Sequence, residues 1–64
     1  SRKNARRSLV AKTNLKKNHI LKKSDILIKR PGTGISPLLI KKFIGKKLKI
    51  NIKKDKVLLK NYFT

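Results

Sequence analysis

The sequence predicts a small, mostly β fold with short helical turns, formed by a chain of 64 residues. Three observations support this class: short apolar runs typical of strands, one stretch with helical periodicity, and an internal repeat between the two halves. A chain of this length forms one domain at most and buries only about 60% of the surface that it exposes when unfolded. Because it contains no cysteine, its stability must come from aliphatic packing, from well-formed turns or from a neighbouring domain.

The first half of the chain contains two expected strands. Residues 8–12 are a short apolar run with a β-branched centre, which predicts one strand, and residues 27–30 are expected to form a second strand that runs into the following loop. Between them, residues 14–18 are rich in turn-forming side chains, and residues 23–26 fit a single helical turn. Residues 1–7 are polar and basic without periodicity, so we expect a linker or disordered N-terminal segment there, followed by a folded domain over residues 8–64.

The second half begins with the clearest helix. Ser36 is the candidate N-cap, Pro37 the first helical residue and Gly45 the stop signal. The apolar residues between these limits recur at the spacing of one helical face; they are Leu39, Ile40, Phe43 and Ile44. Residues 48–53 then alternate between apolar and polar side chains, which predicts a half-buried strand.

An internal repeat relates the two halves. Residues 14–26 align without gaps with residues 51–63, and apolar positions match apolar positions. The matched pairs are Leu15 with Ile52, Ile20 with Val57, Leu21 with Leu58 and Ile26 with Phe63, and a turn residue, Asn18, matches Asp55. Each unit is too small to bury its own apolar face, so we expect two strand-turn-strand-turn units packed about an approximate two-fold axis, with Phe63 in the core.

A loop over residues 30–37 concentrates both prolines and two of the three glycines of the chain. Proline fixes one backbone angle and glycine adopts conformations that other residues avoid, so Pro31, Gly32 and Gly34 are expected to shape this loop. Arg30 stands at its start. A guanidinium offers five donors and stays charged at any working pH, so Arg30 is the main candidate for contact with a polar ligand.

The chain carries a formal net charge of +18, from sixteen lysines and four arginines against two aspartates. Such a charge favours nucleic acid or another polyanion as a partner. However, lysine outnumbers arginine and the lysines are spread along almost the whole chain, which favours a solvated coat over a dedicated site. We expect no specific nucleic-acid partner, and a free-standing polyanion-binding domain is kept as the alternative.

Catalysis by these residues alone is not expected. His19 is interpreted as an exposed turn residue because no acid or nucleophile is placed to work with it, and Asp25 and Asp55 as structural carboxylates at turns or caps. One histidine and two aspartates give no cluster of metal ligands. No apolar run approaches the ~20 residues that span a bilayer, so no membrane partner is expected. The absence of cysteine is compatible with a reducing cytoplasm, where we place the protein.

Four segments together resemble a known family. SLVAK (8–12), LKKN (15–18), KRPGTGISP (29–37) and IGKK (44–47) look like the C-terminal antifreeze-like (SAF) domain of bacterial sialic acid synthases, over about residues 6–62. The RPGTGISP run is the most specific match. Because related synthases for pseudaminic acid tend to vary in this loop, the resemblance leans toward N-acetylneuraminic or legionaminic acid.

The resemblance implies a fold, a parent enzyme and a partner. The fold is the β-clip shared with type III antifreeze proteins. The parent enzyme condenses N-acetylmannosamine, or a related sugar, with phosphoenolpyruvate in a TIM-barrel domain that holds a divalent metal, Mn or Mg. The antifreeze-like domain, without a cofactor or catalytic activity of its own, covers the barrel mouth of the partner subunit in a domain-swapped homodimer.

The resemblance also implies a role for the loop. The arginine that opens it, here Arg30, reaches into the neighbouring active site and contacts the sugar substrate. Thr33 is a weaker candidate for the same contact, whereas Ser36 is favoured as a helix cap. The related fold raises the possibility of ice binding, which we reject because lysines occupy the region that would supply an ice-binding surface; they are Lys12, Lys16, Lys17, Lys22 and Lys23.

Overall fold

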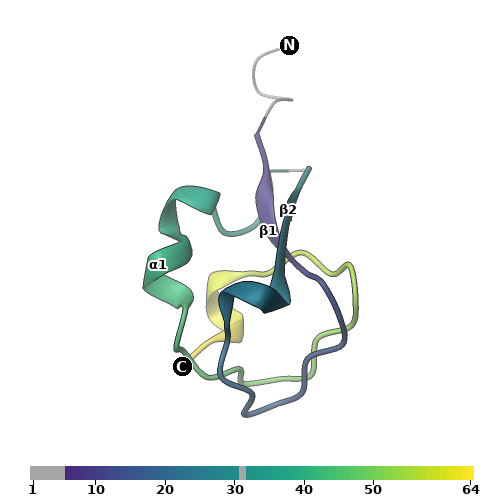
Figure 1. The fold of residues 1–64 in the computed structure, drawn as a ribbon, viewed down its shortest axis with the longest axis vertical. Coiled ribbons are helices and arrows are strands. Elements are labelled where there is room, and N and C mark those ends of the chain that lie inside the picture. Colours follow the sequence, from purple (N-terminus) through teal and green to yellow (C-terminus); the bar gives the residue numbers. More distant parts are fainter. Residues whose placement is uncertain (1–5, 31) are drawn as a thin grey trace.

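The computed structural model describes residues 6–30 and 32–64 (Figure 1). Strands β1 (Ser8–Ala11) and β2 (Ile26–Lys29) pair antiparallel, with Ser8 opposite Lys29 and Ala11 opposite Ile26. Both predicted strands are confirmed, the second starting one residue earlier than expected. A 3₁₀ turn, η2 (Lys23–Asp25), leads into β2 where a single helical turn was predicted.

The predicted helix is confirmed in its limits but has two parts. It begins as a 3₁₀ turn, η3 (Pro37–Leu39), and continues as α1 (Ile40–Phe43). Ser36 is the N-cap, since its Oγ accepts a hydrogen bond from the Leu38 N–H at 3.2 Å. Gly45 follows the helix with a φ of +92°, a conformation that glycine adopts without steric cost.

The predicted strand over residues 48–53 is wrong. Leu48 and Ile52 are buried as the alternation required, and each forms an isolated bridge, to Phe63 and Leu15 respectively. Between them the chain bends, and Ile50 is left 44% exposed. Alternation therefore located the two core positions, but the local hydrogen bonds of this segment are not those of a continuous ladder.

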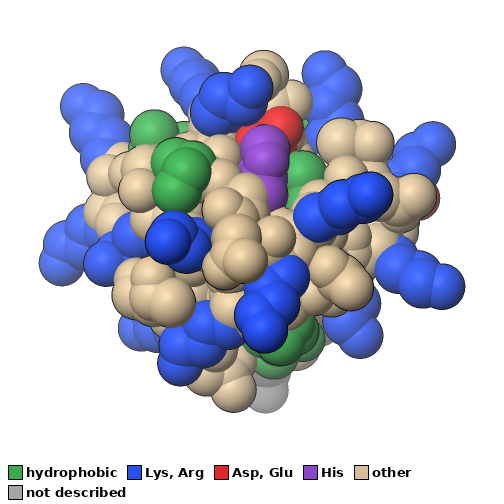
Figure 2. Space-filling model, turned by 90° about the horizontal axis from the view of Figure 1, so that it is seen from below, with side chains coloured by type: hydrophobic (Ala, Val, Ile, Leu, Met, Phe, Trp, Pro, Cys, Tyr) green, Lys and Arg blue, Asp and Glu red, His purple; other side chains and the backbone are tan. Residues whose placement is uncertain are grey.

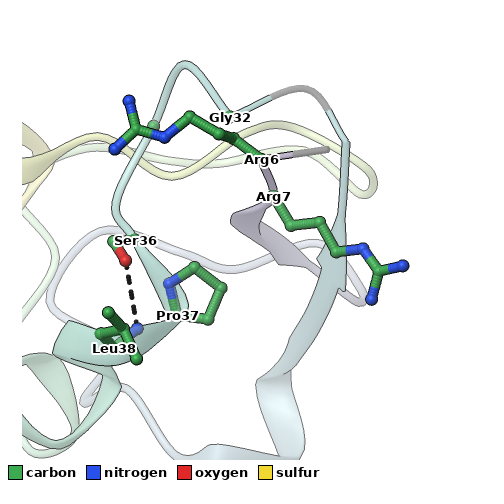
Figure 3. Close-up of a pocket in the computed structure, with 7 residues that line it drawn as sticks. Arg6, Arg7, Gly32, Ser36, Pro37 and Leu38 are labelled. Carbon is green, nitrogen blue, oxygen red and sulfur yellow. Dashed lines mark hydrogen bonds between the residues drawn. The ribbon is translucent and has the colours of Figure 1, made fainter. Parts of the chain in front are cut away.

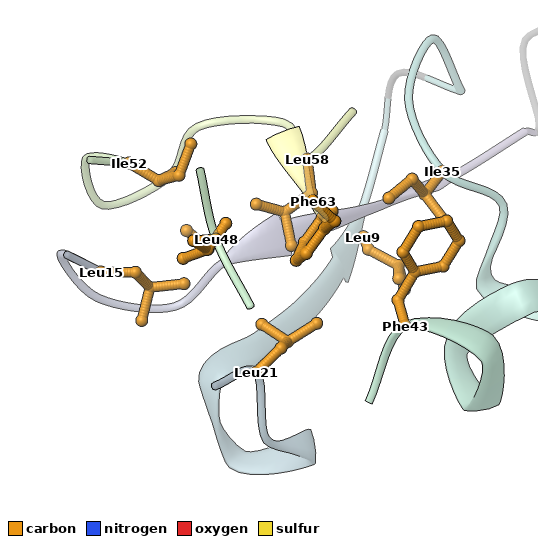
Figure 4. Close-up of a cluster of buried hydrophobic side chains, with 10 residues drawn as sticks. Leu9, Leu15, Leu21, Ile35, Phe43, Leu48, Ile52, Leu58 and Phe63 are labelled. Atoms are coloured by element: carbon orange, nitrogen blue, oxygen red, sulfur yellow. The ribbon is translucent and has the colours of Figure 1, made fainter. Parts of the chain in front are cut away.

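One apolar cluster forms the core between β1 and the helical turns (Figure 4). The rings of Phe43 and Phe63 meet in a tilted arrangement, with centroids 5.2 Å apart. Phe63 is thus a core residue, as predicted. A third 3₁₀ turn, η4 (Lys60–Tyr62), immediately precedes it. The cluster comprises Leu9, Ala11, Leu15, Leu21, Ile35, Phe43, Leu48, Ile52, Leu58 and Phe63.

The two repeated segments exchange hydrogen bonds at matched positions. Asn14 Oδ1 accepts from the Lys54 N–H, and Asn51 Oδ1 accepts from the Lys17 N–H, both at 2.8 Å. In the sequence alignment Asn14 matches Asn51 and Lys17 matches Lys54, so each segment caps the turn of the other. These asparagines satisfy backbone donors that neither segment satisfies by itself.

The backbone repeats the same correspondence. Leu15 and Ile52 exchange two N–H···O bonds of 2.7 Å. The turn residues Asn18 and Asp55 both adopt left-handed backbone, with φ of 73° and 69°. Asparagine and aspartate tolerate this conformation better than other residues with a side chain.

Candidate functional site: the loop after strand β2

The loop that carries Arg30 lies at the end of β2, beside the start of β1 (Figure 1). Arg30 follows β2 directly, in a bend, and is exposed. Among the described residues its side chain forms no ion pair. The guanidinium is therefore not held inward by a carboxylate of the described chain, and its donors are available to another molecule.

Gly32 and Gly34 are required by close approach of the backbone, not by a left-handed conformation. A Cβ on Gly32 would lie 2.3 Å from the Cβ of Arg6. A Cβ on Gly34 would lie 2.3 Å from Val57 Cγ1 and 2.5 Å from the Leu58 carbonyl oxygen. The loop is thus pressed against the segment before β1 and against the C-terminal segment.

The rest of the loop is fixed by hydrogen bonds. The Gly34 N–H donates to Ser8 Oγ at 2.9 Å, and the Ile35 N–H donates to the Leu58 carbonyl at 2.9 Å. Thr33 lies in the exposed turn. Pro31, which the sequence analysis expected to shape the loop, lies outside the described residues.

A hollow of about 320 Å³ lies beside the loop (Figure 3). Arg6 and Arg7 line it but extend toward opposite sides, so their guanidinium groups do not converge on one point. Neither arginine was predicted as a site residue, because both fall in the segment expected to be an N-terminal linker. Their position directly before the first strand was the available signal. The lining comprises Arg6, Arg7, Gly32, Gly34, Ser36, Pro37 and Leu38.

A second hollow, of about 390 Å³, lies where the repeated segments meet, lined by residues 14–16 and 51–53. The basic side chains form no single patch on the face that Figure 2 shows: lysines and arginines project around its whole rim. This distribution agrees with a solvated coat.

A polar pair occupies the face seen in Figure 2. His19 Nε2 lies 2.7 Å from Asp25 Oδ2, and the same oxygen accepts the Lys22 N–H at 2.9 Å. The expectation of an exposed His19 is wrong, since the residue is half-buried against Asp25, whereas Asp25 has the structural role expected. Burial raises the pKa of Asp25. The hydrogen bonds from His19 and Lys22 and the nearby positive charge lower it by more, so the pKa lies below its ordinary value of 3.8.

We expect the stability of the chain to fall in acid because of Asp25. A carboxyl whose pKa is lower in the folded state stabilises the fold fully above its ordinary value of 3.8, and this contribution is lost as pH falls through the folded pKa. Asp25→Asn should lower the free energy of unfolding at pH 7 by about 1–3 kcal/mol and flatten its acid dependence. Urea denaturation at a series of pH values measures both.

Asp55→Asn is the matched control for this prediction. Asp55 pairs with Lys29 at 3.5 Å, both side chains are more than half exposed, and asparagine tolerates the left-handed backbone found there. A surface pair of this kind contributes only about 0–1 kcal/mol. Equal acid dependence in the wild type and Asp25→Asn would contradict the assignment to Asp25.

Within residues 6–30 and 32–64, no group of three histidine, cysteine or acidic side chains is placed to hold a metal ion. In the same part of the chain, no helix has the length and apolar character needed to cross a membrane.

The loop, the capped helix and the turns define a member of a recognised class of small domains. The chain belongs to the SAF domain family, whose model matches residues 6–63. It is 40% identical over 53 residues to N,N'-diacetyllegionaminic acid synthase of Campylobacter jejuni, and 37% identical over 54 residues to the synthase of that name in Legionella pneumophila. These matches cover 83% and 84% of this chain but only 16% and 15% of the relatives. The resemblance found in the sequence is thus confirmed.

The fold has a solved counterpart. An antifreeze protein-like domain from the human N-acetylneuraminic acid phosphate synthase gene matches with a TM-score of 0.85, over 89% of this chain and 73% of that one. Its sequence identity is 24%, so this likeness bears on the fold alone. A mostly β chain with short helical turns and an antifreeze-like fold is thereby confirmed.

Proposed function

We propose that this chain is the accessory substrate-binding domain of a synthase that condenses N-acetylmannosamine, or a related sugar, with phosphoenolpyruvate. The observation that carries the proposal is the RPGTGISP loop, which places an exposed, charged donor next to a rigid turn in a domain related to diacetyllegionaminic acid synthases. The chain spans about a sixth of those relatives, which leaves the chemistry to the remainder of the parent protein.

Arg30 is the residue that we place on the sugar. Its fork of N–H donors suits hydroxyl and acetamido oxygens, and its charge favours an anionic co-substrate nearby. Gly32, Gly34 and the Ser36 cap hold the loop that follows it, so the arginine projects from a stiff support. Thr33, exposed in the turn, is the secondary candidate for the same contact.

The remaining parts of the reaction belong elsewhere in the enzyme. In the proposal, a TIM-barrel domain performs the condensation, and this domain covers the barrel mouth of the partner subunit in a homodimer. We place the divalent metal, Mn or Mg, in that barrel, as the family resemblance implies. The domain by itself is not expected to catalyse condensation.

Arg30→Ala in the full-length enzyme tests the proposal. Loss of a charged hydrogen-bond donor costs about 1.5–3 kcal/mol, so KM for the sugar should rise roughly 10- to 100-fold. KM for phosphoenolpyruvate should change much less. Arg30→Lys keeps the charge but loses the planar guanidinium, so its KM for the sugar should lie between those of the wild type and Arg30→Ala.

Lys23→Ala is the control for this test, since it removes the positive charge of an exposed residue of η2 without touching the loop. It should leave both KM values within about twofold, because an exposed charge remote from the site is largely screened. An unchanged sugar KM in Arg30→Ala would refute the assigned contact.

We also infer that residues 14–26 and 51–63 are related by an approximate two-fold axis. The reciprocal asparagine caps, the doubled Leu15–Ile52 bond pair and the matched left-handed turns support it. The test is superposition of one segment on the other in an experimental structure: a rotation far from half a turn would exclude the axis.

A further inference from the structure

Leu38 is by a wide margin the most exposed large apolar residue in the described chain. Its side chain is 93% exposed, whereas the other exposed aliphatic residues lie between 38% and 48%. Burial of a leucine side chain is favourable, and here that gain is not realised within the domain. A marginal core would gain from turning this residue inward, yet the fold holds it out.

The turn around Leu38 is rigid. Ser36 Oγ accepts the Leu38 N–H, Pro37 fixes the first backbone angle of η3, and the Leu39 N–H donates to the Ser36 carbonyl at 2.9 Å. Leu39 and Ile40 pack against the core. Leu38 therefore projects from a turn that is anchored on both sides, which lowers the entropy cost of binding.

The surroundings of Leu38 restrict what covers it. It borders the hollow that Arg6 and Arg7 line, in a chain of net charge +18 (Figure 3). A second copy of this chain would bring like charges together, so the occupant must be neutral or acidic around its apolar contact. The matches cover only 16% and 15% of the relatives, so a parent protein of that kind has a large remainder able to supply such a surface.

We propose that Leu38 is the anchor by which this domain docks on the catalytic part of its parent synthase, inserting into an apolar pocket with an acidic rim. This inference rests on the proposed function and deepens it. Leu38 and Arg30 belong to the same stretch between β2 and α1, so seating of Leu38 sets the reach of Arg30. Leu38 is thus a positioning residue, and Arg30 remains the sugar contact.

Thiol labelling of the full-length synthase tests the docking without relying on activity. In Leu38→Cys the introduced thiol should react with a maleimide at least tenfold more slowly in the native enzyme than in the denatured enzyme, because docking covers it. In Ile50→Cys, where the domain itself leaves the side chain 44% exposed, the ratio should be within a few-fold. Labelling of the L38C thiol at close to the denatured rate would overturn the inference.

Kinetics of the same enzyme give a second readout. Leu38→Asp should raise KM for the sugar roughly tenfold, the loss expected from failing to bury one leucine. The double variant with Arg30→Ala should be no worse than Arg30→Ala alone, because an undocked arginine contributes nothing. Ile50→Asp is the matched control, expected to leave KM unchanged.

The two proposals fail in different ways. A protected L38C thiol with an unchanged sugar KM in Arg30→Ala would leave the docking intact and refute the sugar contact. A raised KM in Arg30→Ala with a freely reactive L38C thiol and a normal KM in Leu38→Asp would refute the docking anchor alone.

Discussion

Replacement of Leu48 with alanine is expected to lower the free energy of unfolding by about 2–5 kcal/mol. Leu48 is completely buried at the junction of the repeated segments. Its N–H donates to the His19 carbonyl at 3.0 Å and its carbonyl accepts the Asn18 N–H at 2.8 Å. These backbone bonds hold the chain in place, so the cavity left by the side chain can collapse only partly.

The size of the chain makes this loss severe. Small domains sit near the lower end of the usual 5–15 kcal/mol of stability, so the variant should be partly unfolded without denaturant. Urea denaturation followed by far-ultraviolet circular dichroism measures the change.

Ile50→Ala is the control, because Ile50 is two residues away and 44% exposed. The loss there should be clearly smaller, of the order of 1 kcal/mol or less. Equal losses in the two variants would mean that Leu48 and Ile50 are both buried, as in the half-buried strand that the sequence predicts. That result would contradict the bend between Leu48 and Ile52.

Local patterns predicted those parts of the fold that local interactions determine. The Ser36 and Pro37 pair marked the start of the helix and Gly45 its end, because a cap, a fixed angle and a left-handed residue act within one turn. Strand β1 was predicted from a single apolar run. Phe63 was placed in the core from its match with Ile26 in the repeat.

The missed features depend on contacts between distant residues. Leu48 pairs with Phe63 and Ile52 with Leu15, and alternation does not reveal that the partner changes within residues 48–53. His19 is drawn from solvent by Asp25, six residues away. These contacts form only when the chain is folded, so they cannot be predicted from composition or periodicity.

The loop shows the same limit at the candidate site. Its glycines were expected to shape the loop through their conformational freedom. Gly34 is instead required because Val57 and Leu58 leave no space for a Cβ. The helical pattern left Leu38 off the apolar face, and the structure adds that its side chain is 93% exposed. Arg30 was identified from the loop motif, and the structure adds that it is exposed.

Gly34→Val is expected to lower the free energy of unfolding by about 3 kcal/mol, and Gly34→Ala by about 1–3 kcal/mol. The added Cβ would meet Val57 Cγ1 at 2.3 Å and the Leu58 carbonyl oxygen at 2.5 Å. That carbonyl accepts the N–H of the fully buried Ile35, so it cannot retreat without breaking a core hydrogen bond. Overpacking therefore strains backbone and not a flexible side chain.

Gly45→Asn is the matched control for Gly34. No atom lies within 4 Å of a Cβ built on Gly45, and asparagine is among the residues that best tolerate its φ of +92°. This variant should lose no more than about 1 kcal/mol, the difference that left-handed backbone imposes on a residue with a side chain. Urea denaturation measures the loss in each of the three variants, as the shift of the unfolding midpoint at an unchanged m-value. Should Gly34→Val match Gly45→Asn, the loop would have room to move away from the C-terminal segment, and the stiffness that we assign to the support of Arg30 would be lost with it.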